Sequence, residues 1–268
     1  MRVILCLLCL IRFTVLHSTP LSVRAVDFPF AGKLPSNEIT DIYQDHEGFI
    51  WLGTNSGVAR YDGHTVQTFR SDYRHPEMLS NNRVTCFAED GQHVYIGTQN
   101  GLHWYDKLTM TLRPFPNKQL KDKHIYALCS TGDGYIWVSA GNRLYRIDSR
   151  TGHCSLYKLH DRTGRSIQCH AFYLDRKGVF WICSQQGLIR HTPHTGQFVR
   201  MPRIGVRNSP FSLFQDREGR YWISTWGEGL WSMRTDGTPA GTVYRRQPIR
   251  SNRTGSPDLL FFSMTQDD

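Results

Sequence analysis

Catalytic and metal-binding chemistry depends on acidic, histidine and cysteine side chains at particular spacings, and this sequence offers few such arrangements. Two carboxylates beside a cleft are typical of glycosidases. Here the acidic residues recur at the turns of a repeat, which predicts that they end strands and hydrogen-bond tight turns: Asp45, Asp62, Asp90, Asp106, Asp148, Asp175 and Asp216. His191 and His194 flank a proline in a predicted outer turn, which favours a surface pair over a metal site. With no Gly-x-Ser-x-Gly motif and no phosphate-binding loop, we predict no catalytic residue, no metal site and no cofactor.

Side chains suited to ligand binding lie in predicted turns and connections instead. Trp226 replaces a polar turn residue and lies outside the alternating pattern of the neighbouring strands. An exposed indole can stack on a sugar ring, and Arg can bind a carboxylate or sulfate through two parallel hydrogen bonds. We therefore hypothesise an oligosaccharide ligand, acidic in character, bound by the following residues: Trp226, Asn55, Gln99, Arg74, Lys121, Arg165 and Arg207. The alternative is that these loops are solvated surface and that Trp226 packs against a missing repeat or a second domain built from such repeats.

These turns and connections belong to a repeat that runs along the chain. Each copy contains an apolar strand, a glycine turn and a second strand, as in residues 50–62 and 94–106. The anchor residues of successive copies recur at intervals of 41–44 residues: Trp51, Tyr95, Trp137, Trp181 and Trp222. A period of roughly 40–50 residues with several short strands is typical of a β-propeller blade. We therefore predict an all-β chain, in which residues 26–268 form an incomplete β-propeller of five four-stranded blades plus a partial sixth.

The blade pattern also predicts where particular side chains lie. The first strand of each blade carries a small or polar residue at one position, which suits an innermost strand because strands converge near the propeller axis: Asp41, Cys86, Ala127, Ala171 and Ser212. The tryptophans of the second strand are predicted to fill the space between neighbouring blades. The long, variable connections between blades share one face with the turns between second and third strands, and this face is where binding is expected.

The composition and the two ends of the chain limit the possible functions further. Residues 1–25 combine a basic start with a short apolar run, which predicts a secretory signal peptide or an N-terminal anchor. The formal net charge is +9, but no block of like charges occurs, so a nucleic-acid partner is not predicted. Five cysteines lie beyond the first 25 residues without a C-x-x-C pair, which favours buried thiols over a metal or redox motif. Residues 261–268 repeat the pattern of residues 39–46 and predict the first strand of a sixth blade.

The repeated pattern G-x-[IL]-W-[IL]-G-T-x-x-G-[LV]-x-x-[YF]-D resembles the two-component regulator propeller repeat. Residues 48–62 and 91–106 match it best, whereas the third to fifth copies depart at the Gly-Thr pair. The resemblance implies the periplasmic sensor region of a hybrid histidine kinase, tethered to the inner membrane in its full-length form and acting in a phosphorelay that senses oligosaccharides. It further implies that the partners of this chain are the remaining propeller and kinase portions of a longer sensor, and it leaves a homodimer of the full-length protein open.

We therefore predict that the chain is the ligand-sensing part of a signal transduction protein and is not itself an enzyme. Two other functions remain open. A protein-interaction scaffold would be favoured by an apolar exposed face that binds no saccharide. A polysaccharide lyase or hydrolase would shorten a glycan on incubation.

Overall fold

The fold is an open arc of five antiparallel sheets. The computed structural model describes residues 30–72, 74–75, 78–160, 163–192 and 196–248, and the only helix in these ranges is the short 3-10 turn η1 (Ala31–Lys33). Each sheet holds four consecutive strands in chain order. The first three sheets comprise β1 (Ile39–Gln44), β2 (Ile50–Thr54), β3 (Gly57–Tyr61), β4 (Val66–Phe69), β5 (Val84–Glu89), β6 (His93–Thr98), β7 (Gly101–Asp106), β8 (Thr111–Pro114), β9 (Ile125–Ser130), β10 (Tyr135–Ala140), β11 (Arg143–Asp148) and β12 (Cys154–Tyr157). The last two comprise β13 (Cys169–Leu174), β14 (Phe180–Ser184), β15 (Gly187–Thr192), β16 (Gln197–Arg200), β17 (Pro210–Gln215), β18 (Tyr221–Thr225), β19 (Gly229–Arg234) and β20 (Val243–Arg246).

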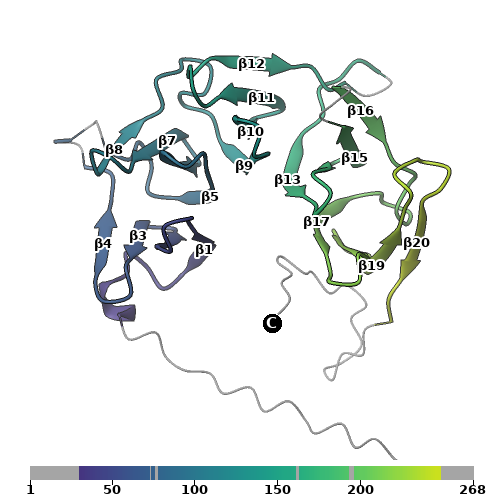
Figure 1. Ribbon diagram of the computed structural model, residues 1–268, viewed down its shortest axis with the longest axis horizontal. Helices are drawn as coiled ribbons and strands as arrows, with labels where there is room; N and C mark the ends of the chain where they lie inside the picture. The colour runs from purple at the N-terminus through teal and green to yellow at the C-terminus, as the bar shows by residue number, and fades with distance from the viewer. Residues whose placement is uncertain (1–29, 73, 76–77, 161–162, 193–195, 249–268) are drawn as a thin grey trace, which may run out of the picture.

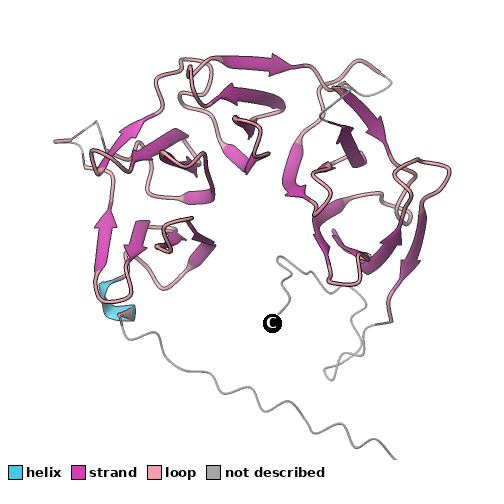
Figure 2. Cartoon of the chain, viewed as in Figure 1, coloured by secondary structure: helices cyan, strands magenta, loops and turns pink. Residues whose placement is uncertain are grey.

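The sheets are arranged as the blades of a propeller. The first strands (β1, β5, β9, β13 and β17) lie around the central opening, and the fourth strands lie at the periphery (Figure 1). Turns and loops join the strands at the two faces (Figure 2). The predicted five four-stranded blades are therefore confirmed. The strand predicted at residues 261–268 and the signal or anchor predicted at residues 1–25 lie outside the described residues.

The hydrophobic core lies between neighbouring blades. The second-strand residues Trp51, Trp137 and Trp181 are completely or almost completely buried, as the sequence predicted. Trp51, for example, packs edge-on against Tyr105 of the next blade, with ring centroids 5.0 Å apart. Trp222 of the fifth blade is half-buried, because the described part of the chain places no sixth blade against it.

Acidic residues at the turns hold these aromatic side chains in place. Trp51 donates its indole N–H to Asp45 at 2.8 Å, and the equivalent indoles of the fourth and fifth blades donate to Asp175 and Asp216 at 2.9 and 2.8 Å. Asp62 instead accepts backbone N–H groups within its own turn. The acidic repeat therefore has the structural role that the sequence predicted, because each carboxylate satisfies donors that burial or a tight turn would leave unpaired.

The Gly-Thr pair of the repeat has a steric explanation. A Cβ atom on Gly97 would lie 2.7 Å from the Cys86 Sγ atom and 2.8 Å from the Cγ2 atom of Ile125 in the next blade, so no side chain fits there. The third blade has Ser139 at this position, and its hydroxyl donates a 2.7 Å hydrogen bond to the backbone oxygen of Cys169 in the fourth blade. In the third blade the next inner strand therefore leaves room for a hydroxyl side chain at this position.

Each inner strand contains a β-bulge at the same place. In β1 the pairing passes from Ile39 to Asp41 and leaves the residue between them without a partner across the sheet. The same one-residue shift occurs in the other four inner strands, and the extra residues are Thr40, Thr85, Tyr126, His170 and Phe211. A bulge redirects the side chains of a strand locally, so this irregularity decides which residues face the axis.

One prediction from the sequence is wrong. His191 does not lie in a surface turn but near the end of β15, where it pairs with Phe198 and is buried. Its ring lies 5.1 Å from the Trp137 ring and 4.5 Å from the Phe198 ring. The strand continues to Thr192, one residue before the proline, so His191 is a core residue. The predicted partner His194 lies outside the described residues.

Candidate functional site

The connections between blades and the turns between second and third strands share one face of the arc, which we call the loop face. Three backbone hydrogen bonds show the contact: Gly101 donates to the oxygen of Lys123, Gln185 to Gln168, and Trp226 to Ser209, at 2.7, 3.1 and 2.9 Å. The variable connections therefore lie beside the turns, as the sequence predicted. The inner strands begin at this face, so their bulges lie close to it.

A cavity of about 440 Å³ lies along the inner strands of all five blades. We call it the axial cavity. Its lining includes the five bulge residues: Thr40, Thr85, Tyr126, His170 and Phe211. It also includes the residues that follow them, among them Asp41 and Ser212. The same repeat position thus presents hydroxyl groups in the first two blades and rings in the last three.

The aromatic lining is supported by further rings from the loop face. Phe211 lies 5.8 Å from Trp226, measured between ring centroids, and Trp226 is 49% exposed. Tyr126 stacks against His124, with centroids 4.1 Å apart and the planes 8° from parallel. His170 lies in the blade between these two pairs. We call Tyr126, His170, Phe211 and Trp226 together the aromatic rim.

Asp41 is the charged residue of the axial cavity. Its Oδ1 atom accepts the backbone N–H of Ile42 at 3.0 Å, and its Oδ2 atom accepts that of Phe87, in the next blade, at 3.1 Å. Burial raises the pKa of Asp41 from 3.8 to about 6, although these two N–H groups stabilise the charged form. Burial lowers the pKa of His170, so this imidazole is neutral near pH 7.

The structure brings together two of the predicted site residues. Arg207 lies across the turn that contains Trp226, because a Cβ on Gly227 would lie 2.5 Å from the Nη1 atom of Arg207. The Glu228 carboxylate accepts the backbone N–H groups of Val206 and Arg207 at 2.8 and 3.0 Å. This carboxylate fixes the connection against the turn, so the Arg207 guanidinium lies against the backbone of the turn that carries Trp226.

The remaining predicted residues lie in other blades of the loop face. Asn55, in the turn of the first blade, donates to the Glu38 carboxylate, and Gln99 lies in the equivalent turn of the second blade. Arg74, Lys121 and Arg165 are exposed in successive connections, and Lys121 lines a separate cavity of about 490 Å³ beside the second blade. These five residues are spread along the arc and do not form one cluster with Trp226.

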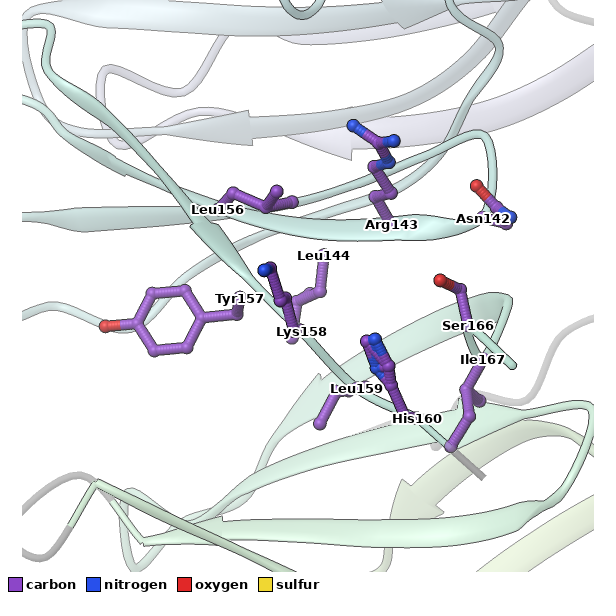
Figure 3. Close-up of a pocket in the computed structure, with 10 residues that line it drawn as sticks. All are labelled: Asn142, Arg143, Leu144, Leu156, Tyr157, Lys158, Leu159, His160, Ser166 and Ile167. Carbon is purple, nitrogen blue, oxygen red and sulfur yellow. The ribbon is translucent and has the colours of Figure 1, made fainter. Parts of the chain in front are cut away.

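A smaller basic pocket lies at the outer part of the third blade. It has a volume of about 170 Å³ and is lined by Arg143, Lys158 and His160 together with Asn142 and Ser166, and none of its described lining residues is acidic. In Figure 3 the Arg143 side chain points away from Lys158 and His160. The pocket therefore adds positive charge to the loop face without directing Arg143 and Lys158 at one point.

The bulge residues of the aromatic rim were missed by sequence reasoning. The signal was present, because Tyr126, His170 and Phe211 each directly precede the small residue of their inner strand. Among the described residues no group of three or more His, Cys, Asp or Glu side chains is placed to hold a metal ion. In the same ranges no helix is long and apolar enough to cross a membrane.

The sequence profile of the two component regulator propeller matches residues 33–56 and 206–227. Two of the five blades therefore contain a segment that matches this repeat. Both matched segments belong to blades of the arc, the first spanning β1 and β2 and the second spanning β17 and β18. Among curated proteins, none matches the sequence.

Solved structures with a similar fold include extracellular domains of putative signalling systems and an enzyme. The extracellular domain of a putative one component system from Bacteroides thetaiotaomicron is 22% identical, with a TM-score of 0.64, and the match covers 80% of this chain and 28% of that one. The extracellular domain of a putative hybrid two component system from the same organism is 18% identical, with a TM-score of 0.63 and coverage of 86% and 30%. Virginiamycin B lyase from Staphylococcus aureus, an enzyme, is 15% identical, with a TM-score of 0.62 and coverage of 80% and 71%.

This propeller chain therefore spans about 30% of the length of the extracellular domains that it resembles. At these levels of identity the likeness concerns the fold. The similar extracellular domains belong to a putative one component system and a putative hybrid two component system.

Proposed function

We propose that this chain is an extracytoplasmic ligand-sensing propeller of a two-component signalling system and that it binds an oligosaccharide at the loop face, over the mouth of the axial cavity. The aromatic rim is the main observation that supports the proposal. Tyr126, His170 and Phe211, from three neighbouring blades, line one cavity. Trp226 is half exposed and packs against Phe211 of this group.

The chemistry of the rim suits a sugar. An aromatic ring offers a flat apolar surface to the C–H face of a pyranose, and the polar groups beside it can bond the hydroxyls at the ring edge. Thr40 and Ser212 supply hydroxyl groups to the cavity wall. Arg207 lies against the turn that carries Trp226, so we propose that it binds a carboxylate or sulfate of a ligand that stacks on the indole.

The acidic character of the ligand rests on the charge of the loop face. Lys121, Arg165 and Arg207 are exposed in three different connections, and the pocket of Figure 3 adds Arg143 and Lys158. We propose that acidic substituents of an extended ligand face these side chains, while the ring that stacks lies over the axis. Such contacts weaken with added salt, because exposed charges are screened.

The proposed biological context is a longer sensor. Residues 1–25 act in export, as a signal peptide or an anchor, and residues 26–268 form propeller repeats in the periplasm. The remaining propeller and kinase portions of that sensor are the proposed protein partners, with a homodimer as the proposed state of the full-length protein. The repeat profile and the sensor domains of similar fold support this context.

Titration calorimetry with neutral, uronic and sulfated oligosaccharides at two salt concentrations tests the proposal. We expect Trp226→Ala to weaken binding by about tenfold or more, as for the removal of a central aromatic contact. Acidic ligands should lose affinity as salt is raised, whereas neutral ligands should not. Binding of no glycan, or binding that Trp226→Ala leaves unchanged, would contradict the proposal. Recovery of a shortened glycan would instead indicate an enzyme.

A further inference from the structure

We propose that the axial cavity binds an ammonium group, so that the sugar unit over the propeller axis is an amino sugar with a free amine. This inference rests on the proposed function and adds the chemical class of the central sugar. The acidic groups proposed above lie on the outer part of the ligand and are negatively charged. The ammonium group proposed here belongs to the central sugar of the ligand and is positively charged.

The first argument is the charge of the cavity wall. Of the described residues that line the axial cavity, Asp41 is the one with a charged side chain, and no lysine or arginine is among them. The other titratable groups of that wall are Cys86 of β5, Tyr126 of β9 and His170 of β13. Burial raises the pKa of Cys86 to about 12 and lowers that of His170, so neither carries charge near pH 7. The cavity is therefore locally acidic on a chain whose formal net charge is +9.

The second argument is that Asp41 lacks a cationic partner. Within the described part of the chain, its two oxygens accept only the backbone N–H groups of Ile42 and Phe87, and no lysine or arginine there is paired with it. A carboxylate has about four lone-pair sites, so each oxygen can accept a further hydrogen bond. A partly buried carboxylate without a counter-charge is unfavourable, and a ligand ammonium would supply the missing charge.

The third argument is the set of rings in the same cavity. Tyr126, His170 and Phe211 come from three consecutive blades, and an ammonium group is attracted to the face of an aromatic ring. His124 stacks on Tyr126 and fixes the orientation of that ring. Rings together with one carboxylate favour an organic ammonium over a metal ion, because calcium and magnesium require several oxygen ligands.

The test compares two ligands of equal length and linkage, a glucosamine tetramer and its fully N-acetylated counterpart, by titration against the 268-residue chain at pH 7. The positive net charge of the chain disfavours a cationic ligand overall. Tighter binding of the glucosamine tetramer than of its N-acetylated counterpart would therefore indicate a local acidic site. We expect the amine to bind about tenfold or more tightly, the size typical of a hydrogen bond between charged groups.

Variants assign this preference to Asp41. Asp41→Asn removes the charge, and Asp41→Ser introduces the residue type that the fifth blade carries at this position, Ser212. Both variants should lose the preference for the free-amine tetramer. Glu47→Gln removes one charge from an exposed residue of the same blade at the opposite face, and it should keep the preference. Lowering the pH from 7 to 5 should reduce the preference of the wild-type chain, because Asp41 becomes protonated while the amine stays charged.

The outcomes separate this inference from the proposed function. Equal binding of both tetramers by the wild-type chain, or a preference that survives in both Asp41 variants, would overturn the amine site and leave glycan binding in place. Binding of neither tetramer while a uronic or sulfated oligosaccharide binds would also overturn it alone. If no oligosaccharide binds at all, the proposed function and the amine site fail together.

Discussion

Replacing Asp41 by Asn should stabilise the free protein at neutral pH, and the size of the effect follows from the geometry. The pKa of Asp41 rises from 3.8 to about 6 on folding, roughly two pH units, and each unit corresponds to about 1.4 kcal/mol. Ionised Asp41 therefore costs the folded state about 3 kcal/mol near pH 8. Asn carries no charge and avoids this cost. Its single side-chain oxygen can accept only one of the two N–H groups, so the lost hydrogen bond reduces the gain in stability by about 1 kcal/mol.

The sign of the pH dependence follows from the direction of the pKa shift. A carboxyl whose pKa is raised by folding stabilises the folded state fully below its unfolded value, and this stability is lost as the pH rises through about 6. The free energy of unfolding of Asp41→Asn minus that of the wild-type chain should therefore increase by about 2 kcal/mol between roughly pH 4.5 and pH 7.5. Urea denaturation at a series of pH values measures this difference without adding salt.

Asp62→Asn is the matched control for this experiment. Hydrogen bonds from the Thr65 backbone and hydroxyl and from the His64 backbone lower the pKa of Asp62 to about 2. Its stabilising effect is fully present above about pH 4 and is lost only as the pH falls toward 2, so the difference between Asp62→Asn and the wild-type chain should be flat between pH 4.5 and pH 7.5. A difference between Asp41→Asn and the wild-type chain that is flat across the pH range would refute the reasoning, because it would mean that the Asp41 carboxyl is not desolvated.

Three further predictions concern the blades themselves. Asp175→Ala should lower the free energy of unfolding by about 3 kcal/mol in urea titrations, because this carboxylate accepts from a buried indole and from a tyrosine hydroxyl of the next blade; an unchanged midpoint would contradict its structural role. Gly97→Ala should cost about 1–3 kcal/mol, because the new Cβ would clash with Cys86 and Ile125. Burial raises the pKa of the Cys183 thiol to about 12, so mass-resolved alkylation should label it only after unfolding.

The repeat made the fold predictable from the sequence. Because the same apolar and glycine positions return every 41–44 residues, the strands, the buried Trp51 and the acid at the turn beside it follow from one pattern. His191 was misplaced because the turn was predicted to begin before the proline, whereas β15 continues to Thr192. A pattern indicates that a turn is near but leaves its boundary uncertain by a residue or two.

The candidate site was predictable only in part. Trp226 was recognisable because it broke the alternation of its strand, and the structure confirms that it is exposed. The direction of Tyr126, His170 and Phe211 depends on a one-residue shift in pairing, and simple alternation does not reveal such a shift. The spread of Arg74, Lys121 and Arg165 along the arc also depends on how the blades are placed in space.

Oxidative footprinting with and without a bound oligosaccharide tests most directly whether the ligand lies over the axial cavity. Trp226 and Trp222 form an internal comparison, because both belong to the fifth blade, yet only Trp226 contacts Phe211 at the cavity. The account predicts that the oligosaccharide protects Trp226, Tyr126 and His170 from oxidation and leaves Trp222 unchanged. Saturation with a ligand that leaves Trp226 as reactive as in the free protein would contradict it.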